Sequence, residues 1–226
     1  MLSTLDKERI EAAVTDAETG TTGEIVVVLA AEVSNYREVP LAWGAAAALA
    51  LPPIALALGL RPMAMAGEAG VWLVAQASAF EAELIFALAL YALAQILLFV
   101  ATSVVVSIPP IRRTLTPAAL KRHRVQRAAQ HHFAALAARA KAGETGVLIF
   151  VGVDDRQVRV LADAALHAKV GESVWTRAAA AVGRAMKRGP DPTAGIVEAV
   201  KICGAALKAH FPGDQPHEWP ARPQEI

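Results

Sequence analysis

Two adjacent carboxylates, Asp154 and Asp155, are the side chains of this chain most able to do chemistry. They follow the apolar stretch 146–153, which is predicted to be a buried strand. Carboxylate oxygens are the ligands that hard cations such as Ca²⁺ and Mg²⁺ prefer. Glu24 and Asp163 lie at other predicted strand ends and could join them if the sheet brings those ends together. Two carboxylates alone do not complete a cation site. Asp-Asp-Arg is also a good tight turn, because aspartate tolerates turn geometry and bonds its own backbone.

A basic run follows the most apolar part of the chain. Residues 107–141 contain no acid and eight basic residues, which are Arg112, Arg113, Lys121, Arg122, Arg124, Arg127, Arg139 and Lys141. A metal site is not expected here, because the histidines of the run (His123, His131 and His132) have neither suitable spacing nor an accompanying acid or cysteine.

Nucleic acid is not expected as a partner of this run either. Nucleic-acid binding would call for interleaved aromatic side chains, and Phe133 is the only one there. Anionic lipid headgroups explain the run better, at about 1 kcal/mol per basic residue near the surface. The residues expected to contact lipid are Arg112, Arg113, Lys121, Arg122, Arg124 and Arg127.

Other common chemistries lack their motifs. The sequence has no Walker-type loop, no Gly-x-Ser-x-Gly, no His-Glu-x-x-His and no cysteine pair. The single cysteine, Cys203, cannot form an internal disulfide. The first ten residues have no apolar run behind their charges, unlike a signal peptide. We therefore expect synthesis to begin in the cytoplasm.

Hydrophobic residues concentrate in one part of the chain. They make up 55% of it, and charged residues only 19%, against about 25% charged in a typical soluble domain. The charged residues between positions 41 and 111 are Arg61, Glu68, Glu81 and Glu83. The uncharged stretches 41–60 and 84–106 are each long enough to cross a bilayer core of about 30 Å as a helix. The sequence predicts a transmembrane hairpin; the alternative, two buried helices of a soluble core, would normally show a polar stripe.

The charges around the hairpin predict its orientation. Its loop has one basic residue, Arg61, against the eight that follow the second segment. Because positive charge is retained on the cytoplasmic side, we expect a multi-pass protein of the inner (plasma) membrane with both termini in the cytoplasm. Glu81 and Glu83 are expected to mark the outer edge of the second helix. A longer helix would draw them toward the bilayer, where carboxylates are usually functional.

The segments on either side of the hairpin have α/β patterning. Residues 24–30 and 146–153 are apolar throughout, as buried central strands are, and residues 157–162 alternate as a strand with one wetter face does. Neither soluble part can bury a core alone. We predict one α/β domain formed by residues 1–38 and 112–212. The hairpin at 39–111 is expected to interrupt its first crossover, and residues 213–226 are expected to be a mobile, proline-rich tail.

Four phrases in these segments resemble the TPM domain family, at residues 22–28, 143–151, 155–160 and 194–197. The resemblance implies an α/β fold with a mixed sheet flanked by helices, here split by the hairpin. Members of the family are described as acid phosphatases, or as assembly or repair factors for membrane complexes. Resemblance to the family's acidic turn makes Asp154 and Asp155 candidate ligands for Ca²⁺ or Mg²⁺; no other cofactor is implied.

These observations predict an integral membrane protein whose cytoplasm-facing, TPM-like domain works by binding. It would serve as an assembly or accessory factor for a membrane complex, with membrane lipid and other membrane proteins as partners and no catalytic residue. The alternative is a metal-dependent acid phosphatase that uses the Asp154–Asp155 turn.

Overall fold

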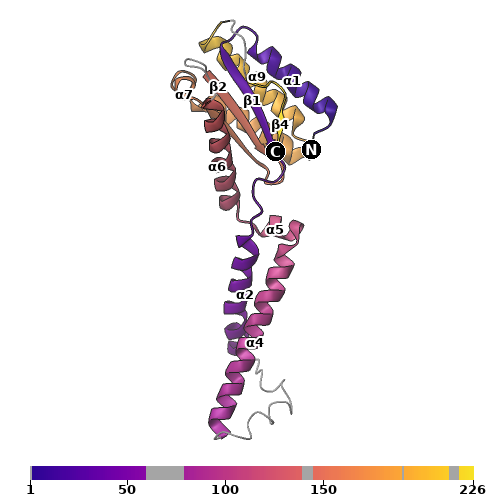
Figure 1. Ribbon diagram of the computed structural model, residues 1–226, viewed down its shortest axis with the longest axis vertical. Coiled ribbons are helices and arrows are strands. Elements are labelled where there is room, and N and C mark those ends of the chain that lie inside the picture. The colour runs from indigo at the N-terminus through magenta and orange to yellow at the C-terminus, as the bar shows by residue number, and fades with distance from the viewer. Residues whose placement is uncertain (1, 60–78, 139–144, 190, 214–218) are drawn as a thin grey trace. The chain divides into compact units, whose positions relative to one another are not determined.

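The computed structural model (Figure 1) describes residues 2–59, 79–138, 145–189, 191–213 and 219–226. The chain forms two compact units. The first, which we call the sheet unit, consists of Met1–Asn35 and Pro117–Ile226, and the second, the hairpin unit, is Tyr36–Thr116. The hairpin unit therefore interrupts the sheet unit between the first two strands of its sheet, as the sequence predicts.

A mixed four-stranded sheet forms the centre of the sheet unit, with strand order β3-β2-β1-β4. β1 runs parallel to β2 and to β4, and β2 runs antiparallel to β3. The register pairs Gly23 with Thr145 and Ala30 with Gly152, so the two central strands are aligned over their whole length. The strands are β1 Gly23–Ala30, β2 Thr145–Gly152, β3 Gln157–Ala162 and β4 Gln224–Glu225.

Helices cover both faces of this sheet, which confirms the mixed α/β fold. Successive residues of a strand point to opposite faces, so Ile25 and Val27 pack with α1, α8 and α9, whereas Val26 and Val28 pack with α6 (Figure 1). Every residue of β1 and β2 is buried, which explains their uninterrupted apolar runs. The helices of this unit are α1 Thr4–Glu18, α6 Ala118–Ala137, α7 Ala164–Val170, α8 Glu172–Arg188 and α9 Thr193–His210.

The hairpin unit contains two long apolar helices that lie side by side, α2 Glu38–Ala57 and α4 Ala79–Ser107, followed by the short α5 Pro109–Leu115. α2 packs so closely on α4 at Gly44 that a Cβ there would overlap the Ser103 hydroxyl. α2 and the Leu84–Ser107 part of α4 are long and apolar enough to cross a membrane, with mean hydropathies of 1.7 and 2.5. The most apolar 18-residue window of that part of α4 buries none of its residues inside the protein, unlike a core helix of a soluble domain.

Three short elements were not predicted from the sequence. They are α5, α7 and β4. The Thr116 hydroxyl donates to the Arg112 carbonyl (2.6 Å) at the end of α5, and α6 begins at Ala118. Glu81 and Glu83 fall near the start of α4, and their side chains lie outside the described residues.

The C-terminal segment differs from the mobile tail that the sequence predicts. The Ile226 amide donates to the Leu29 carbonyl (2.9 Å), and the Ala31 amide donates to the Ile226 carbonyl (3.1 Å). Trp219 packs into the core on the α6 side, and its amide donates to Glu24 Oε2 (2.9 Å). Residues 219–226 are therefore part of the sheet unit, whereas residues 214–218 lie outside the described residues. A strand of two residues is too short to show a periodicity in sequence.

Candidate functional site

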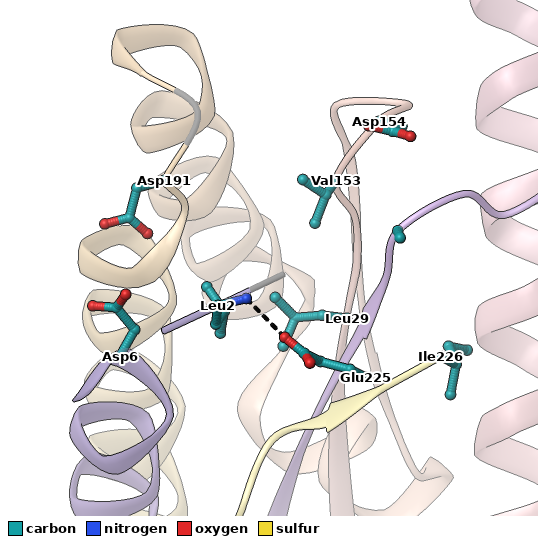
Figure 2. A pocket seen from close by; sticks show the side chains of 9 residues that line it. Leu2, Asp6, Leu29, Val153, Asp154, Asp191, Glu225 and Ile226 are labelled. Carbon is teal, nitrogen blue, oxygen red and sulfur yellow. Dashed lines mark hydrogen bonds between the residues drawn. The ribbon is translucent and has the colours of Figure 1, made fainter. Parts of the chain in front are cut away.

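The candidate site is a pocket of about 380 Å³ at the carboxyl ends of β1 and β2 (Figure 2). Ligands of open α/β sheets characteristically bind outside this end of the strands. Four of the nine lining residues are acids, and they come from α1, the β2–β3 turn, the segment before α9, and β4. The lining residues are Leu2, Asp6, Leu29, Ala31, Val153, Asp154, Asp191, Glu225 and Ile226.

Two of the acids, Asp6 and Asp191, lie at the starts of helices. Asp6 forms a capping box with Ser3 at the start of α1, where each side chain bonds the other's backbone amide. Asp191 Oδ1 accepts hydrogen bonds from the amide (2.9 Å) and the hydroxyl (2.6 Å) of Thr193, the first residue of α9. Figure 2 shows Asp6 and Asp191 on the same side of the pocket. Their carboxylates are therefore already engaged in satisfying helix termini.

A third acid, Glu225, joins β4 to the N-terminal segment. Its carboxylate accepts hydrogen bonds from Lys7 Nζ (2.7 Å) and from the Leu2 amide (2.8 Å), the second of which is drawn in Figure 2. The bond from Lys7, together with that from Leu2, lowers the pKa of Glu225 below its ordinary value. The carboxylate form is thus favoured by the fold, and its role here is to hold two chain ends together.

The lowered pKa of Glu225 predicts acid release of β4. A carboxylate whose pKa is lower in the folded than in the unfolded chain stabilises the fold above its unfolded pKa, and this contribution is lost as pH falls. We expect the protection of the Leu2 and Ile226 amides from hydrogen exchange, relative to an unfolded chain at the same pH, to fall below about pH 4.3, the ordinary glutamate value. In Glu225→Gln, these amides should exchange faster at neutral pH, and the acid step should disappear. An unchanged acid step in the variant would show that another group causes it.

Asp154 and Asp155 have different environments in the turn between β2 and β3. Asp154 lines the pocket, across from Asp6 and Asp191 (Figure 2), whereas Asp155 is only 6% exposed and does not line it. The turn is tied to β1 by the bond from the Asp154 amide to the Ala31 carbonyl (3.2 Å). It is closed by the bond from the Arg156 amide to the Val153 carbonyl (3.2 Å), with Arg156 at a φ of 50°. These are the features of a tight turn.

The side chains present do not form a ready cation site. Within the described part of the chain, no group of three or more histidine, cysteine, aspartate or glutamate side chains is placed to hold a metal ion. Ca²⁺ takes six to eight oxygen ligands, and Mg²⁺ needs near-octahedral geometry. Binding of Ca²⁺ or Mg²⁺ by Asp154 and Asp155 therefore stays a prediction, to which the described residues add no further ligand.

Glu24 and Asp163 lie at the other end of the sheet, so they cannot join this turn. Glu24 is in register with Gly146, near the beginning of β2, and Asp163 Oδ2 accepts from the Gly146 amide (2.9 Å). Gly146 and Gly152 are six residue steps apart along the strand, or about 20 Å. Because β3 runs antiparallel to β2, the end of β3 lies beside the start of β2. Asp163 instead caps α7, where it accepts from the Leu166 amide (2.8 Å).

The six basic residues expected to contact lipid belong to both units. Arg112 and Arg113 are on α5 of the hairpin unit, and the other four are on α6 of the sheet unit. On α6, Arg122 and Arg127 are exposed, but at 100° per residue they point about 140° apart. Three of the other basic residues, Arg112, Lys121 and Arg124, are half-buried. Farther along α6, burial and the neighbouring His131 lower the pKa of His132, whose ring packs on Phe150.

Three of the four acids in the pocket were not identified from the sequence. Asp6 had a local signal, because Ser3-x-x-Asp6 has the spacing of a capping box, and Asp191-Pro192 precedes apolar residues at helical spacing. Neither signal indicates that the two caps lie at one pocket. Glu225 had none, because it lies in the segment expected to be mobile.

The fold and the pocket define a mixed α/β domain with an acidic pocket at the end of its parallel strands and an inserted pair of apolar helices. The TPM domain family model matches residues 105–206, which confirms the predicted resemblance to that family. The chain is also similar to BA42 protein from the psychrophilic bacterium Bizionia argentinensis, solved by NMR, with a TM-score of 0.54 and 17% sequence identity. That similarity covers 100% of this chain and 96% of the other, and it shows the fold. No curated protein matches the chain.

Proposed function

We propose that this is an integral membrane protein whose TPM-like sheet unit faces the cytoplasm and acts by binding. In this role it would be an assembly or accessory factor for a membrane complex. The observation that carries the proposal is the insertion of two apolar helices into the crossover between β1 and β2. Through that insertion, both parts of the sheet unit would be held on one side of the membrane.

The exposed surface of the hairpin unit supports insertion in lipid. Large apolar side chains of α4 are exposed, among them Ile85 (64%), Leu97 (60%) and Val104 (63%). Exposed apolar surface costs about 25 cal/mol per Å² in water, and that cost is removed in hydrocarbon. The absence of Lys and Arg from α4, followed by Arg112 and Arg113 on α5, favours retention of the α5 end in the cytoplasm.

The pocket supports binding more than catalysis. Asp6 and Asp191 satisfy helix termini, and Glu225 is paired with Lys7. General acid or base catalysis needs a group whose proton can be exchanged with the substrate near the working pH. The pKa of Glu225 is lowered, which moves it further below neutral pH. The family's phosphatase activity, with Asp154 and Asp155 as metal ligands, is the second candidate function.

An enzyme assay separates the two candidates. Full-length protein in detergent would be given an aryl phosphate with Mg²⁺, with Ca²⁺ or with a chelator, beside an Asp154→Asn/Asp155→Asn variant. The binding proposal predicts no turnover above background in any of these conditions; the thermal stability measured with each cation tests the cation site separately. Asp16→Asn, which changes an exposed acid on α1, is the matched control for loss of charge.

Metal-dependent turnover that is lost in the double variant and kept in Asp16→Asn would contradict the binding proposal. It would establish the phosphatase instead. Cation stabilisation without turnover, again lost in the double variant, would place a structural cation at the β2–β3 turn while leaving binding as the function.

A further inference from the structure

A second groove, of about 440 Å³, runs along the outer edge of β3. Five consecutive residues of this strand, 158–162, line it. Because consecutive strand residues point to opposite faces, a groove lined by all five follows the edge of the strand and not one face of the sheet. The other lining residues come from α6, α7 and α8 and are Gln126, His167, Glu172, Trp175, Thr176 and Ala179.

β3 is the terminal strand on this side of the sheet. In the described part of the chain it pairs only with β2. Alternate backbone N–H and C=O groups of a terminal strand point outward without a sheet partner, and such an edge can accept another strand. No proline or lysine interrupts residues 157–162, although those residues are common means of blocking an edge.

Two residues that line this groove each carry a buried donor with no acceptor in the described part of the chain. Arg159 Nε and Trp175 Nε1 are buried, and neither has a hydrogen-bond partner within the described part of the chain. Trp175 as a whole is only 4% exposed. An unsatisfied buried donor costs about 1–3 kcal/mol. Acceptors supplied by a ligand in the groove would recover that cost.

The two donors lie on opposite faces of the sheet edge. Trp175 belongs to the core shared with α8, as does Val158. Arg159 follows Val158 and therefore points to the other face, where Leu161 packs with α6. An extended chain presents its side chains alternately to both faces, so one added strand can reach both donors. A small anion cannot lie on both faces at once.

The charge around the groove favours an acidic partner. Arg159 and His167 line it, and α6 beside it carries four lysine and arginine residues and no acid. Glu172 is the one acid among the lining residues. The Glu172 side chain lies at the start of α8, where the helix dipole stabilises its charge.

We propose that this groove binds an extended, acidic polypeptide segment, which adds a strand to β3. Backbone hydrogen bonds to the β3 edge would supply affinity, and alternate carboxylates on the α6 side, one of them at Arg159, would supply specificity. A hydroxyl or amide oxygen on the other side would accept from Trp175. The inference rests on the proposed binding function and names the chemistry of its partner.

The test is titration calorimetry of full-length protein in detergent with a synthetic peptide, acetyl-Val-Glu-Val-Glu-Thr-Glu-Val-amide. We expect binding of one peptide per chain, weakened about tenfold by Arg159→Gln, which removes a charge-assisted hydrogen bond. Trp175→Phe, which replaces the indole and its N–H with a smaller phenyl ring, should weaken binding several-fold. Arg177→Gln, an exposed arginine on α8 outside the groove, is the matched control and should bind as the parent does.

Two peptide controls keep the inference falsifiable if a variant fails to fold. A peptide with lysine in place of glutamate should not bind, and one with alternate backbone amides methylated should bind at least tenfold more weakly. The groove inference would be overturned if either control peptide bound as well as the acidic peptide, or if Arg159→Gln left binding unchanged. It would also be overturned by a dimer that forms through this edge and that the acidic peptide does not dissociate. None of these results depends on membrane sidedness or on phosphatase activity, so the groove inference can fail while the proposed function stands.

Discussion

Replacing Trp219 with alanine is expected to lower the free energy of unfolding of the sheet unit by about 3 kcal/mol. Truncating a large aromatic side chain in a core typically costs this much. The indole packs in the core on the α6 side, and the Trp219 amide bonds the buried Glu24. The same residue anchors the segment that leads to β4. Urea unfolding followed by circular dichroism would measure the change. Arg222→Ala, at an exposed position in the same segment, should cost less than about 0.5 kcal/mol.

Gly146 provides a stricter test of the same contact. A Cβ at Gly146 would overlap the Trp219 ring, so Gly146→Ala should cost about 1–3 kcal/mol in the parent protein. With Trp219→Ala in place, the overlap is gone and the glycine substitution should cost much less. The expected coupling in this double-mutant cycle is about 1 kcal/mol or more. Additive effects of the two substitutions would mean that the C-terminal segment does not pack on β2 in solution.

Under the proposed function, removing residues 36–116 is expected to release the protein from the membrane while its sheet is kept. Asn35 would be joined to Pro117 by about ten glycine and serine residues, a flexible linker of about 17 Å mean span. Both cores of the sheet unit are formed by residues outside the excised segment. The excised chain should therefore appear in the soluble fraction and unfold cooperatively on heating.

A matched control keeps both helices. When only residues 60–78 are replaced by a glycine and serine loop, α2 and α4 remain, and the protein should stay in the membrane fraction after an alkaline wash. Folded, excised protein that stays with the membrane would contradict the assignment of the anchor to the hairpin unit. It would show that the sheet unit binds membrane by itself.

The strands and the hairpin were predictable because their signals are continuous in sequence. β1 and β2 are buried on both faces, so each is an unbroken apolar run, and α2 and α4 are uncharged over membrane-spanning lengths. β4 was not predictable, since a two-residue strand is defined by its neighbour and not by its own pattern. The packing of Trp219 was not predictable either, because only the fold places it over Gly146.

The candidate site depends on sheet register in the same way. Glu24 and Asp163 lie at strand ends, as the sequence suggests. The parallel pairing of β1 with β2 puts Glu24 at the opposite end of the sheet from Asp154, and the antiparallel pairing of β3 with β2 does the same for Asp163. Asp6 and Asp191 could be recognised as residues near helix starts, because the hydrogen bonds at a helix start are local. That they share a pocket with Glu225 follows from where α1, α9 and β4 pack on the sheet, which local patterns do not encode.

The central claim is that the hairpin crosses the membrane and leaves the sheet unit in the cytoplasm, and cysteine labelling can test it. The native Cys203 is fully buried, and burial raises its pKa to about 12, so it should not react with a maleimide in the folded protein. Single cysteines can therefore be introduced at two exposed positions. These are Leu58→Cys at the end of α2, where the native side chain is 77% exposed, and Arg177→Cys on α8.

The decisive measurement is labelling of these two variants in intact spheroplasts with a maleimide that does not cross membranes. We predict that Leu58→Cys is labelled at once, and that Arg177→Cys is labelled only after the membrane is permeabilised. Labelling of Arg177→Cys in intact spheroplasts, or of Leu58→Cys only after permeabilisation, would contradict the account.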